Sequence, residues 1–242
     1  MFDYISSFFD LKSNVVETKS SKKNNFNTFI LYDYSPFMII PSSLESFKKS
    51  HKGKFWYNIR RSKRIVEDEL GEFSFQKHYN SEALLYLDEF RTLFLTKWKN
   101  DYTSFGWKTD TGYNKFKSQL DKIILNNPDT FEIATLRLKS DNKLLAYSLG
   151  FVLNNTYYFF MHNVNLNFNK SKYSLGTIFL KNLINSFIEN KNIKNFDFML
   201  GLNPYKMKWT KNIKPIYWHI YTIKSFKGLF IHYFKVCIFY LK

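Results

Sequence analysis

The sequence predicts an α+β domain, a mixed α/β sandwich, because strands come in a run before a helix and a further strand. Three segments with strand-like patterning follow one another, and an Asn154-Asn155 pair typical of a tight hairpin turn joins the last two. A polar loop, an amphipathic helix and a short apolar segment come next. That order is characteristic of a mixed sheet with helices packed on it. The predicted elements span residues 130–138, 144–153, 157–164, 175–190 and 194–200.

The first half of the chain is predicted to add one strand, three helices and a second short strand. A polar stretch at residues 20–27 indicates a loop. Ser42 or Ser43 can cap a helix that continues to Gly71 in two pieces around Gly53. The remaining elements are a strand at 29–40, a strand at 73–78, and helices at 81–99 and 113–126.

The composition is that of a globular protein. Of the 242 residues, 45% are hydrophobic and 23% are charged, which excludes a wholly disordered chain. The single cysteine, Cys237, excludes an intrachain disulfide framework and a cysteine-cluster metal site. It also fits a reducing compartment.

Neither a membrane-spanning helix nor a secretion signal is expected. No apolar run reaches 18 residues. Asp3 and Asp10 lie where a signal peptide needs basic and then apolar residues. We therefore expect a cytoplasmic location, with peripheral attachment at the inner face of the membrane as a further expectation from the tail described below.

The chain is strongly basic, with 36 Lys and Arg against 20 Asp and Glu. Abundant Asn, Ile, Phe and Tyr, together with more Lys than Arg, are what A+T-rich codons give, so part of the excess reflects mutational bias. Arg60, Arg61 and Arg64 nevertheless fall within five positions on one predicted helix. They could contact phosphate groups, or form a solvated face paired with the acidic residues 67–69.

A predicted helix begins immediately after Tyr173, at Ser174-Leu175-Gly176-Thr177. The first turn of a helix has unpaired N–H groups and the positive end of the helix dipole. Glycine there allows a ligand to approach the backbone closely. These residues predict either a phosphate-binding site or a capped helix start without a ligand.

A second cluster of polar residues follows the last predicted strand. Asp197 lies within an otherwise apolar strand, where a charge must be paired or used. Gly201 ends that strand, and Tyr205, Lys206 and Trp209 follow. The alternative interpretation is that Asp197 caps local backbone and Tyr205 packs.

Taken together, these motifs resemble the CelD-type (cellulose-biosynthesis-type) branch of the GNAT acyltransferases, which is related to the Fem-type transferases. Residues 56–64 (WYNIRRSKR) resemble its N-R-R-x-x-R helix, and residues 196–209 resemble its f-D-f-x-x-G-x-x-x-Y-K-x-x-W signature. Residues 144–147 resemble its x-x-i-A segment, and Tyr-Ser-Leu-Gly at 173–176 takes the place of S-P-G. The resemblance covers roughly residues 36–212. Leu175 stands where the family usually has proline.

The resemblance implies a GNAT fold with an N-terminal helical extension, and acetyl-CoA or another acyl-CoA as co-substrate, without a metal. Ser174, Leu175, Gly176 and Thr177 would bind the pyrophosphate, and backbone groups near residues 157–164 would hold the thioester carbonyl. His162 and Asp197 are the candidate general bases, and Tyr205 is the candidate acid. Arg60, Arg61, Arg64, Lys206 and Trp209 are the candidate substrate-binding residues.

The C-terminal part is basic and aromatic, with eight lysines from Lys206 to Lys242. It could lie in a membrane interface with its lysines at anionic head groups, or form a final strand and a docked helix. We accordingly divide the chain into residues 1–50, the remnant of a first GNAT-like lobe, 51–212, the acyltransferase domain, and 213–242, the tail.

The function predicted from these features is transfer of an acyl group, most simply acetyl, to an amine or hydroxyl of a small-molecule or lipid-linked sugar in surface polysaccharide assembly. One alternative is a Fem-type transferase that uses aminoacyl-tRNA. The other is a noncatalytic protein that binds nucleic acid or a membrane surface, which is less expected because the periodicities place most aromatic residues in a core.

Overall fold

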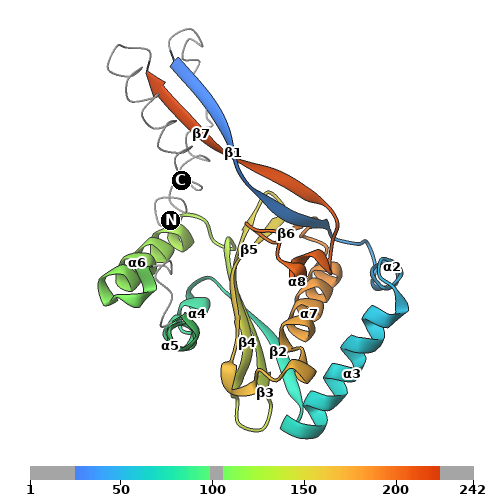
Figure 1. Ribbon diagram of the computed structural model, residues 1–242. Helices are drawn as coiled ribbons and strands as arrows, with labels where there is room; N and C mark the ends of the chain where they lie inside the picture. Colours follow the sequence, from blue (N-terminus) through green and yellow to red (C-terminus); the bar gives the residue numbers. More distant parts are fainter. Residues whose placement is uncertain (1–24, 99–105, 224–242) are drawn as a thin grey trace. The chain divides into compact units, whose positions relative to one another are not determined.

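The computed structural model describes residues 25–98 and 106–223 (Figure 1). The chain divides into two compact units. The first contains residues 38–199, and the second contains residues 25–37 and 200–223 of the described chain.

The first unit contains a mixed sheet whose described strands run in the order β2-β3-β4-β5-β6. Neighbouring strands are antiparallel except β5 and β6, which are parallel. This arrangement confirms the predicted mixed α/β fold. The strands are β2 (Phe73–Tyr79), β3 (Phe131–Leu138), β4 (Leu144–Leu153), β5 (Thr156–Val164) and β6 (Asn195–Asp197).

The β4–β5 hairpin has the predicted turn. Asn154 and Asn155 have φ angles of 50° and 57°, so both are in the left-handed region that an I′ turn requires. Asparagine enters this region more easily than most residues because its short polar side chain bonds locally. The turn therefore fixes the register between β4 and β5, the two strands that it joins.

Two helices precede β2, in the two pieces predicted around Gly53. They are α2 (Leu44–Lys49) and α3 (Gly53–Leu70). Ser43 caps α2 by accepting from the Ser46 N–H, and the Ser46 hydroxyl accepts in return from the Ser43 N–H. The predicted cap is thus confirmed, with Ser46 completing the capping box.

The single helix predicted at 81–99 is wrong, because the chain forms two helices there. These are α4 (Asn80–Leu84) and α5 (Leu87–Trp98), and α6 (Asp110–Asn126) follows. The N–H groups of Leu85 and Tyr86 donate to carbonyls three residues back, which tightens the chain between α4 and α5. Leu85, which lies between the two helices, is consequently 79% exposed.

Helices cover both faces of this sheet (Figure 1). Helices α3 and α7 (Leu175–Asn190) lie on one side, and α4, α5 and α6 lie on the other. Strand β3 is buried along its whole length, as a central strand covered on both faces must be. Fully buried aromatic side chains fill both layers, among them Trp107, Tyr147, Tyr157, Phe90, Phe131 and Phe196.

Strand β6 is shorter than the predicted segment 194–200, since it ends at Asp197. Met199 has a φ of 61°, which a strand does not allow, and the Asp197 carboxylate accepts the Met199 N–H at 2.8 Å. The chain therefore turns directly after Asp197.

The second unit is built on a long antiparallel pair, β1 (Asn25–Ile39) with β7 (Ile213–Ile223). Strand β1 begins within the stretch predicted to be a loop, so that loop prediction is wrong for residues 25–27. A short helix, α8 (Pro204–Met207), also belongs to this unit. The first part of the predicted tail is thus a strand, and residues 224–242 lie outside the described chain.

Candidate functional site

The start of α7 presents two open N–H groups. Ser174 occupies the N-cap position with φ 46°, and its side chain makes no capping bond to the helix. The Ser174 carbonyl accepts from the N–H groups of Thr177 and Ile178. Within the described chain, the N–H groups of Leu175 and Gly176 have no acceptor. The side-chain cap that the sequence allowed does not form, so these donors remain available to an anion.

Space around Gly176 is also open on the side of the backbone where a side chain would project. A Cβ added there would meet only Val164 Cγ2, at 3.7 Å, an ordinary contact. The first turn of α7 contains no acidic residue. A phosphate can therefore approach this turn without steric or charge conflict.

Ion pairing at the end of α3 holds the loop that leads into α7. Glu69 accepts from the Tyr173 hydroxyl at 2.8 Å and pairs with Lys172. These contacts lower the pKa of Glu69, with Lys172 the larger cause. The loop before the open N–H groups is thereby tied to α3.

His162 lies on β5, beyond the region where β5 pairs with β6. Within the described chain that parallel pairing covers residues 156–158, whereas β5 continues to Val164. The His162 ring stacks on Phe159 with centroids 4.5 Å apart. Val164, which contacts the start of α7, is two positions further along. His162 and the open turn of α7 therefore lie toward the same end of β5.

Asp197 is buried and accepts a backbone hydrogen bond. Its carboxylate holds the turn at Met199, and in the ladder it lies opposite Tyr158. This contact is the local backbone cap that the sequence allowed as an alternative to catalysis. A buried carboxylate that accepts an N–H contributes to the turn whether or not it has a chemical role.

Tyr205, Lys206 and Trp209 belong to the second unit, whereas His162, Asp197 and residues 174–177 belong to the first. Burial raises the pKa of Tyr205, so this phenol keeps its proton well above neutral pH. Lys206 is buried and its ammonium donates to the Leu200 carbonyl. Trp209 is buried as well.

Arg60, Arg61 and Arg64 are exposed on α3, and none of their guanidinium groups has an ion pair or hydrogen bond within the described chain. The predicted alternative, pairing with residues 67–69, does not occur for these three. Glu67 pairs with Lys63 instead, at 3.4 Å. Of the three arginines, Arg60 lines a cavity between α3, β2 and α7.

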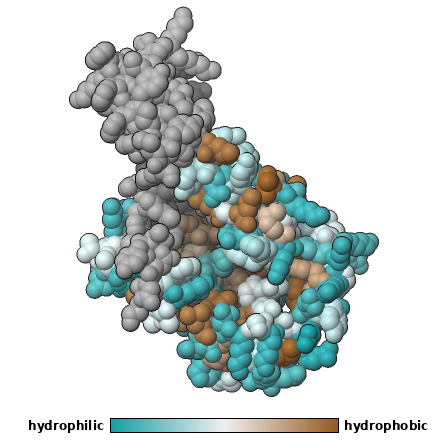
Figure 2. Space-filling view, in the orientation of Figure 1, coloured by the Kyte–Doolittle hydropathy of each residue, from teal (hydrophilic) through white to brown (hydrophobic). Residues whose placement is uncertain are grey.

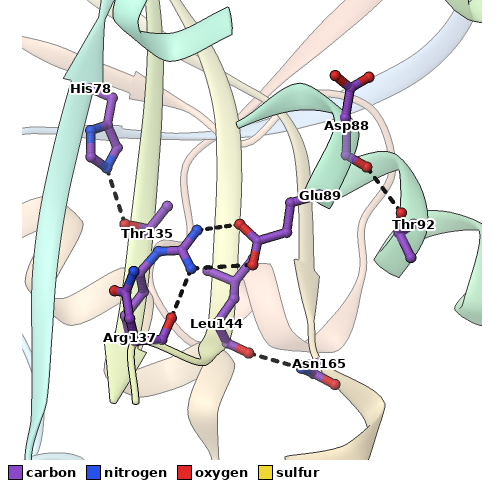
Figure 3. Close-up of polar contacts among 9 residues, drawn as sticks. His78, Asp88, Glu89, Thr92, Thr135, Arg137, Leu144 and Asn165 are labelled. Atoms are coloured by element: carbon purple, nitrogen blue, oxygen red, sulfur yellow. Dashed lines mark hydrogen bonds and ion pairs between the residues drawn. The ribbon is translucent and has the colours of Figure 1, made fainter. Parts of the chain in front are cut away.

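A polar cluster that the sequence reasoning missed lies on the α4–α5 side of the sheet (Figure 3). His78 contacts Glu82 through Nδ1 at 2.8 Å. Its Nε2 lies 3.3 Å from Thr135 Oγ1, the contact drawn in Figure 3. Arg137 pairs with Glu89 and donates to the Asn142 carbonyl. An acid, a histidine and a hydroxyl thus follow one another as in a nucleophilic triad.

This cluster is closed to substrates. Thr135 is 0% exposed and His78 is 5% exposed. The signal for it was present in the sequence, since strand 131–138 carries Glu132 on one face and Thr135 and Arg137 on the other. Charged residues on both faces of a buried strand require partners on both sides. The arrangement therefore attaches α4 and α5 to the sheet.

Two further features bear on the class of site. The residues with described positions contain no group of three or more His, Cys, Asp or Glu side chains suited to a metal ion. Within the same residues, no helix has the length and apolar character needed to cross a membrane.

Solved structures with a similar fold include a protein of unknown function from Bacteroides thetaiotaomicron VPI-5482, with a TM-score of 0.51 at 10% identity. They also include the C-terminal domain of a putative lysylphosphatidylglycerol synthetase from Agrobacterium fabrum (0.52, 11%) and FemX (0.55, 8%). These matches cover 91%, 88% and 86% of this chain, but only 67%, 66% and 66% of the other chains, respectively. At such identities the likeness shows the fold alone.

No curated protein matches the sequence significantly. A family model described as an acetyltransferase (GNAT) domain matches residues 53–207. That range includes α3, the whole described sheet of the first unit, the open turn of α7 and α8. Because the match extends over more than half of the sequence, the chain belongs to the GNAT acetyltransferase family, in the CelD-type branch that the motifs indicated.

Proposed function

We propose that the protein is an acyltransferase that moves an acyl group, most simply acetyl, from acyl-CoA to an amine or hydroxyl of a sugar or sugar conjugate. The observation that carries the proposal is the open first turn of α7 in a chain of the GNAT family. The donors of Leu175 and Gly176, the absence of acidic residues in that turn and the room beside Gly176 all suit a pyrophosphate.

Each candidate residue has a role consistent with its surroundings. Acyl-CoA, when bound, supplies a thioester carbonyl carbon that an acceptor can attack. His162 accepts the proton that the attacking amine or hydroxyl loses as the new bond forms. The family resemblance assigns the role of proton donor to Tyr205, and its raised pKa keeps the phenol protonated at neutral pH. Asp197 holds the turn after β6.

The acceptor part of the proposal rests on the family resemblance and on charge. A lipid-linked sugar phosphate would bring an anionic group to a chain with a net charge of +16. A peripheral location at the inner face of the membrane would follow from such an acceptor, with the basic segment 213–242 at the head groups.

The first experiment is thermal unfolding with and without acetyl-CoA, with free CoA and ATP as controls. A ligand that binds only the folded chain raises its stability, by about 2.7 kcal/mol at a concentration 100 times the Kd. Gly176→Asp places a carboxylate in the open turn and is expected to remove the rise in Tm caused by acetyl-CoA.

Gly53→Asp is the matched control, because Gly53 also lies in the first turn of a helix and has nothing within 4 Å of an added Cβ. Its response to acetyl-CoA should equal that of the wild type. An unchanged Tm with acetyl-CoA and longer acyl-CoAs at millimolar concentration would contradict the proposal.

A second candidate function is Fem-type transfer from aminoacyl-tRNA. The observation that favours it is the exposed pair Arg61 and Arg64, which has no partner in the described chain and could contact phosphates. Binding of total tRNA that is lost in the double variant Arg61→Ala/Arg64→Ala, together with no effect of acetyl-CoA on Tm, would select this function.

A further inference from the structure

A cavity of about 240 Å³ lies in the first unit between α3, β2 and α7. Figure 1 shows α3 beside α7, and in Figure 2 most residues along the right-hand edge, the side on which α3 lies, are hydrophilic. The cavity shares no lining residue with the α7 turn at 174–177. Its lining residues are Ile59, Arg60, Lys63, Glu67, Phe73, Phe75, Ile178, Lys181 and Asn182.

Positive charge accumulates around this cavity. Arg60, Lys63 and Lys181 line it, and the one lining carboxylate, Glu67, pairs with Lys63 at 3.4 Å. Once that pair is counted, Arg60 and Lys181 remain as cations that pair with no carboxylate of the lining. Like charges that converge on one cavity repel each other, and a bound anion would relieve the repulsion.

The effect of this charge repulsion is clearest at Lys181. Burial lowers its pKa, and Lys63 and Lys48 lower it further, against the opposing effect of Glu189. With the Asn185 amide oriented by its hydrogen bonds, Lys181 Nζ donates to the amide oxygen at 3.0 Å. That acceptor is neutral, so it satisfies one donor without compensating the charge.

The rest of the lining is apolar except for Asn182, whose amide donates to the Ile178 carbonyl at 3.0 Å. Ile59, Phe73, Phe75 and Ile178 contribute hydrocarbon surface from all three elements that form the cavity. Drug-sized ligands occupy cavities of about 300–1,000 Å³, so this one suits a smaller molecule. An inorganic anion would leave the apolar walls unused, and an uncharged hydrocarbon would leave the cations uncompensated.

We propose that the cavity between α3, β2 and α7 binds a small amphiphilic organic anion, with a carboxylate or phosphate group at Arg60 and Lys181 and an apolar body against Phe73, Phe75 and Ile178. This site is additional to the acyl-CoA site proposed at the start of α7. A medium-chain fatty acid and an alkyl phosphate both have the required chemistry.

Isothermal titration calorimetry on the full chain tests the site with defined probes. Octanoate and octyl phosphate combine both features, acetate and inorganic phosphate have the anionic group alone, and octylamine has the chain with the opposite charge. We expect one or both amphiphilic anions to bind with 1:1 stoichiometry and the three other probes to bind at least tenfold more weakly. Binding of octanoate alone would indicate a fatty acid as the source, and binding of octyl phosphate alone a phosphorylated lipid.

Variants distinguish this cavity from other basic surfaces. Arg60→Met and Lys181→Met each remove one charge and should weaken binding about tenfold, as expected for a hydrogen bond to a charged group. Arg64→Met is the matched control, since Arg64 is exposed on the same helix and does not line the cavity. Ile178→Trp fills the apolar part and should also abolish binding.

Three results would overturn the proposal. They are no binding of either amphiphilic anion, binding of octylamine as tight as that of octanoate, or equal affinity in wild type, Arg60→Met and Lys181→Met. A competition experiment with saturating acetyl-CoA separates this site from the cofactor site, and we expect the affinity for the probe to stay unchanged. Displacement of the probe by acetyl-CoA would assign the cavity to the cofactor and overturn the proposal of a separate site. Failure of acetyl-CoA to bind at all would contradict only the proposed function.

Discussion

The ammonium of Lys77 on β2 lies 2.7 Å from the carboxylate of Glu132 on β3, and both side chains are largely buried. The Lys77 ammonium also lies 4.2 Å from the centre of the Phe187 ring. Burial raises the pKa of Glu132 above its ordinary value, although Lys77 acts in the opposite direction. Removing one member of such a pair leaves the other buried and uncompensated.

Lys77→Met should therefore lower the free energy of unfolding by about 3–5 kcal/mol at neutral pH. Urea unfolding of the purified variant measures the change. The control is Lys139→Met, which breaks a pair of similar length, Lys139 with Glu72 at 2.8 Å, that is exposed. No measurable loss is expected there, and equal losses in the two variants would contradict a role for burial.

The buried Lys77–Glu132 pair also predicts how the free energy of unfolding depends on pH. Because the pKa of Glu132 is higher in the folded chain than in the unfolded chain, the folded chain binds this proton more tightly. The contribution of Glu132 to stability is therefore complete below the unfolded pKa and decreases as pH rises toward the folded pKa. Glu132→Gln should abolish this part of the decrease, and Lys77→Met should enlarge it. Unfolding free energies measured across the acidic and neutral range give the slopes, and identical slopes in all three proteins would refute the assignment.

Gly150→Ala should destabilise the sheet. A Cβ at this position would lie 2.1 Å from Tyr157 Cζ, and Tyr157 is fully buried on the next strand. Its ring cannot move without disturbing the core, so we expect a loss of about 1–3 kcal/mol. Gly53→Ala is the comparison, because a Cβ there meets nothing within 4 Å and should leave stability unchanged or higher by up to about 1 kcal/mol. Chemical denaturation of the wild type and both variants measures these changes in the free energy of unfolding.

His162→Gln should lower the rate of acyl transfer by about 10²–10⁴-fold while the melting temperature stays close to that of the wild type. A general base shapes the dependence of the rate on pH, so the pH profile of the variant should differ from that of the wild type. CoA released from acetyl-CoA with glucosamine as acceptor reports the rate. A variant that keeps the wild-type pH profile would remove His162 from the chemistry.

Tyr205→Phe tests the proposed acid. The raised pKa of Tyr205 means that its proton remains in place through the neutral and mildly alkaline range. Wild-type activity should therefore show no loss from this group between about pH 7 and 9, whereas Tyr205→Phe should be slower at every pH in that range. A matched substitution is Tyr217→Phe, at an exposed position in the second unit, which should be silent. Equal rates for wild type and Tyr205→Phe would show that the phenol is not needed.

Local patterns in the sequence predicted several elements to their exact ends. The helix at 175–190 has an unbroken apolar periodicity, and the strand at 144–153 ends at an asparagine pair that forces a turn. The family was also readable from motifs at 56–64 and 196–209, because short ordered motifs survive where overall identity is low. These features depend on neighbours in the chain.

Features that hydrophobic patterning does not report were not predictable in the same way. The end of β6 at Asp197 follows from a side chain that captures the Met199 N–H, a choice that an apolar segment does not reveal. The interruption between α4 and α5 places Leu85 in solvent despite its hydrophobicity. The local sequence around Lys181 does not show that this residue lines a cavity, because the cavity forms only where α7 lies against α3 and β2.

The short connections of the β3–β4–β5 meander bear on how the chain acquires its structure. A few residues link β3 to β4, and Asn154-Asn155 alone join β4 to β5, so closing these loops costs little conformational entropy. Strand β6 can join β5 only after the chain has crossed through α7, a connection of far greater length. We therefore expect the meander to form early in folding and the parallel β5–β6 contact late. Substitutions at Asn154 and Asn155 would then slow folding, whereas substitutions at Asn195 and Phe196 would mainly accelerate unfolding.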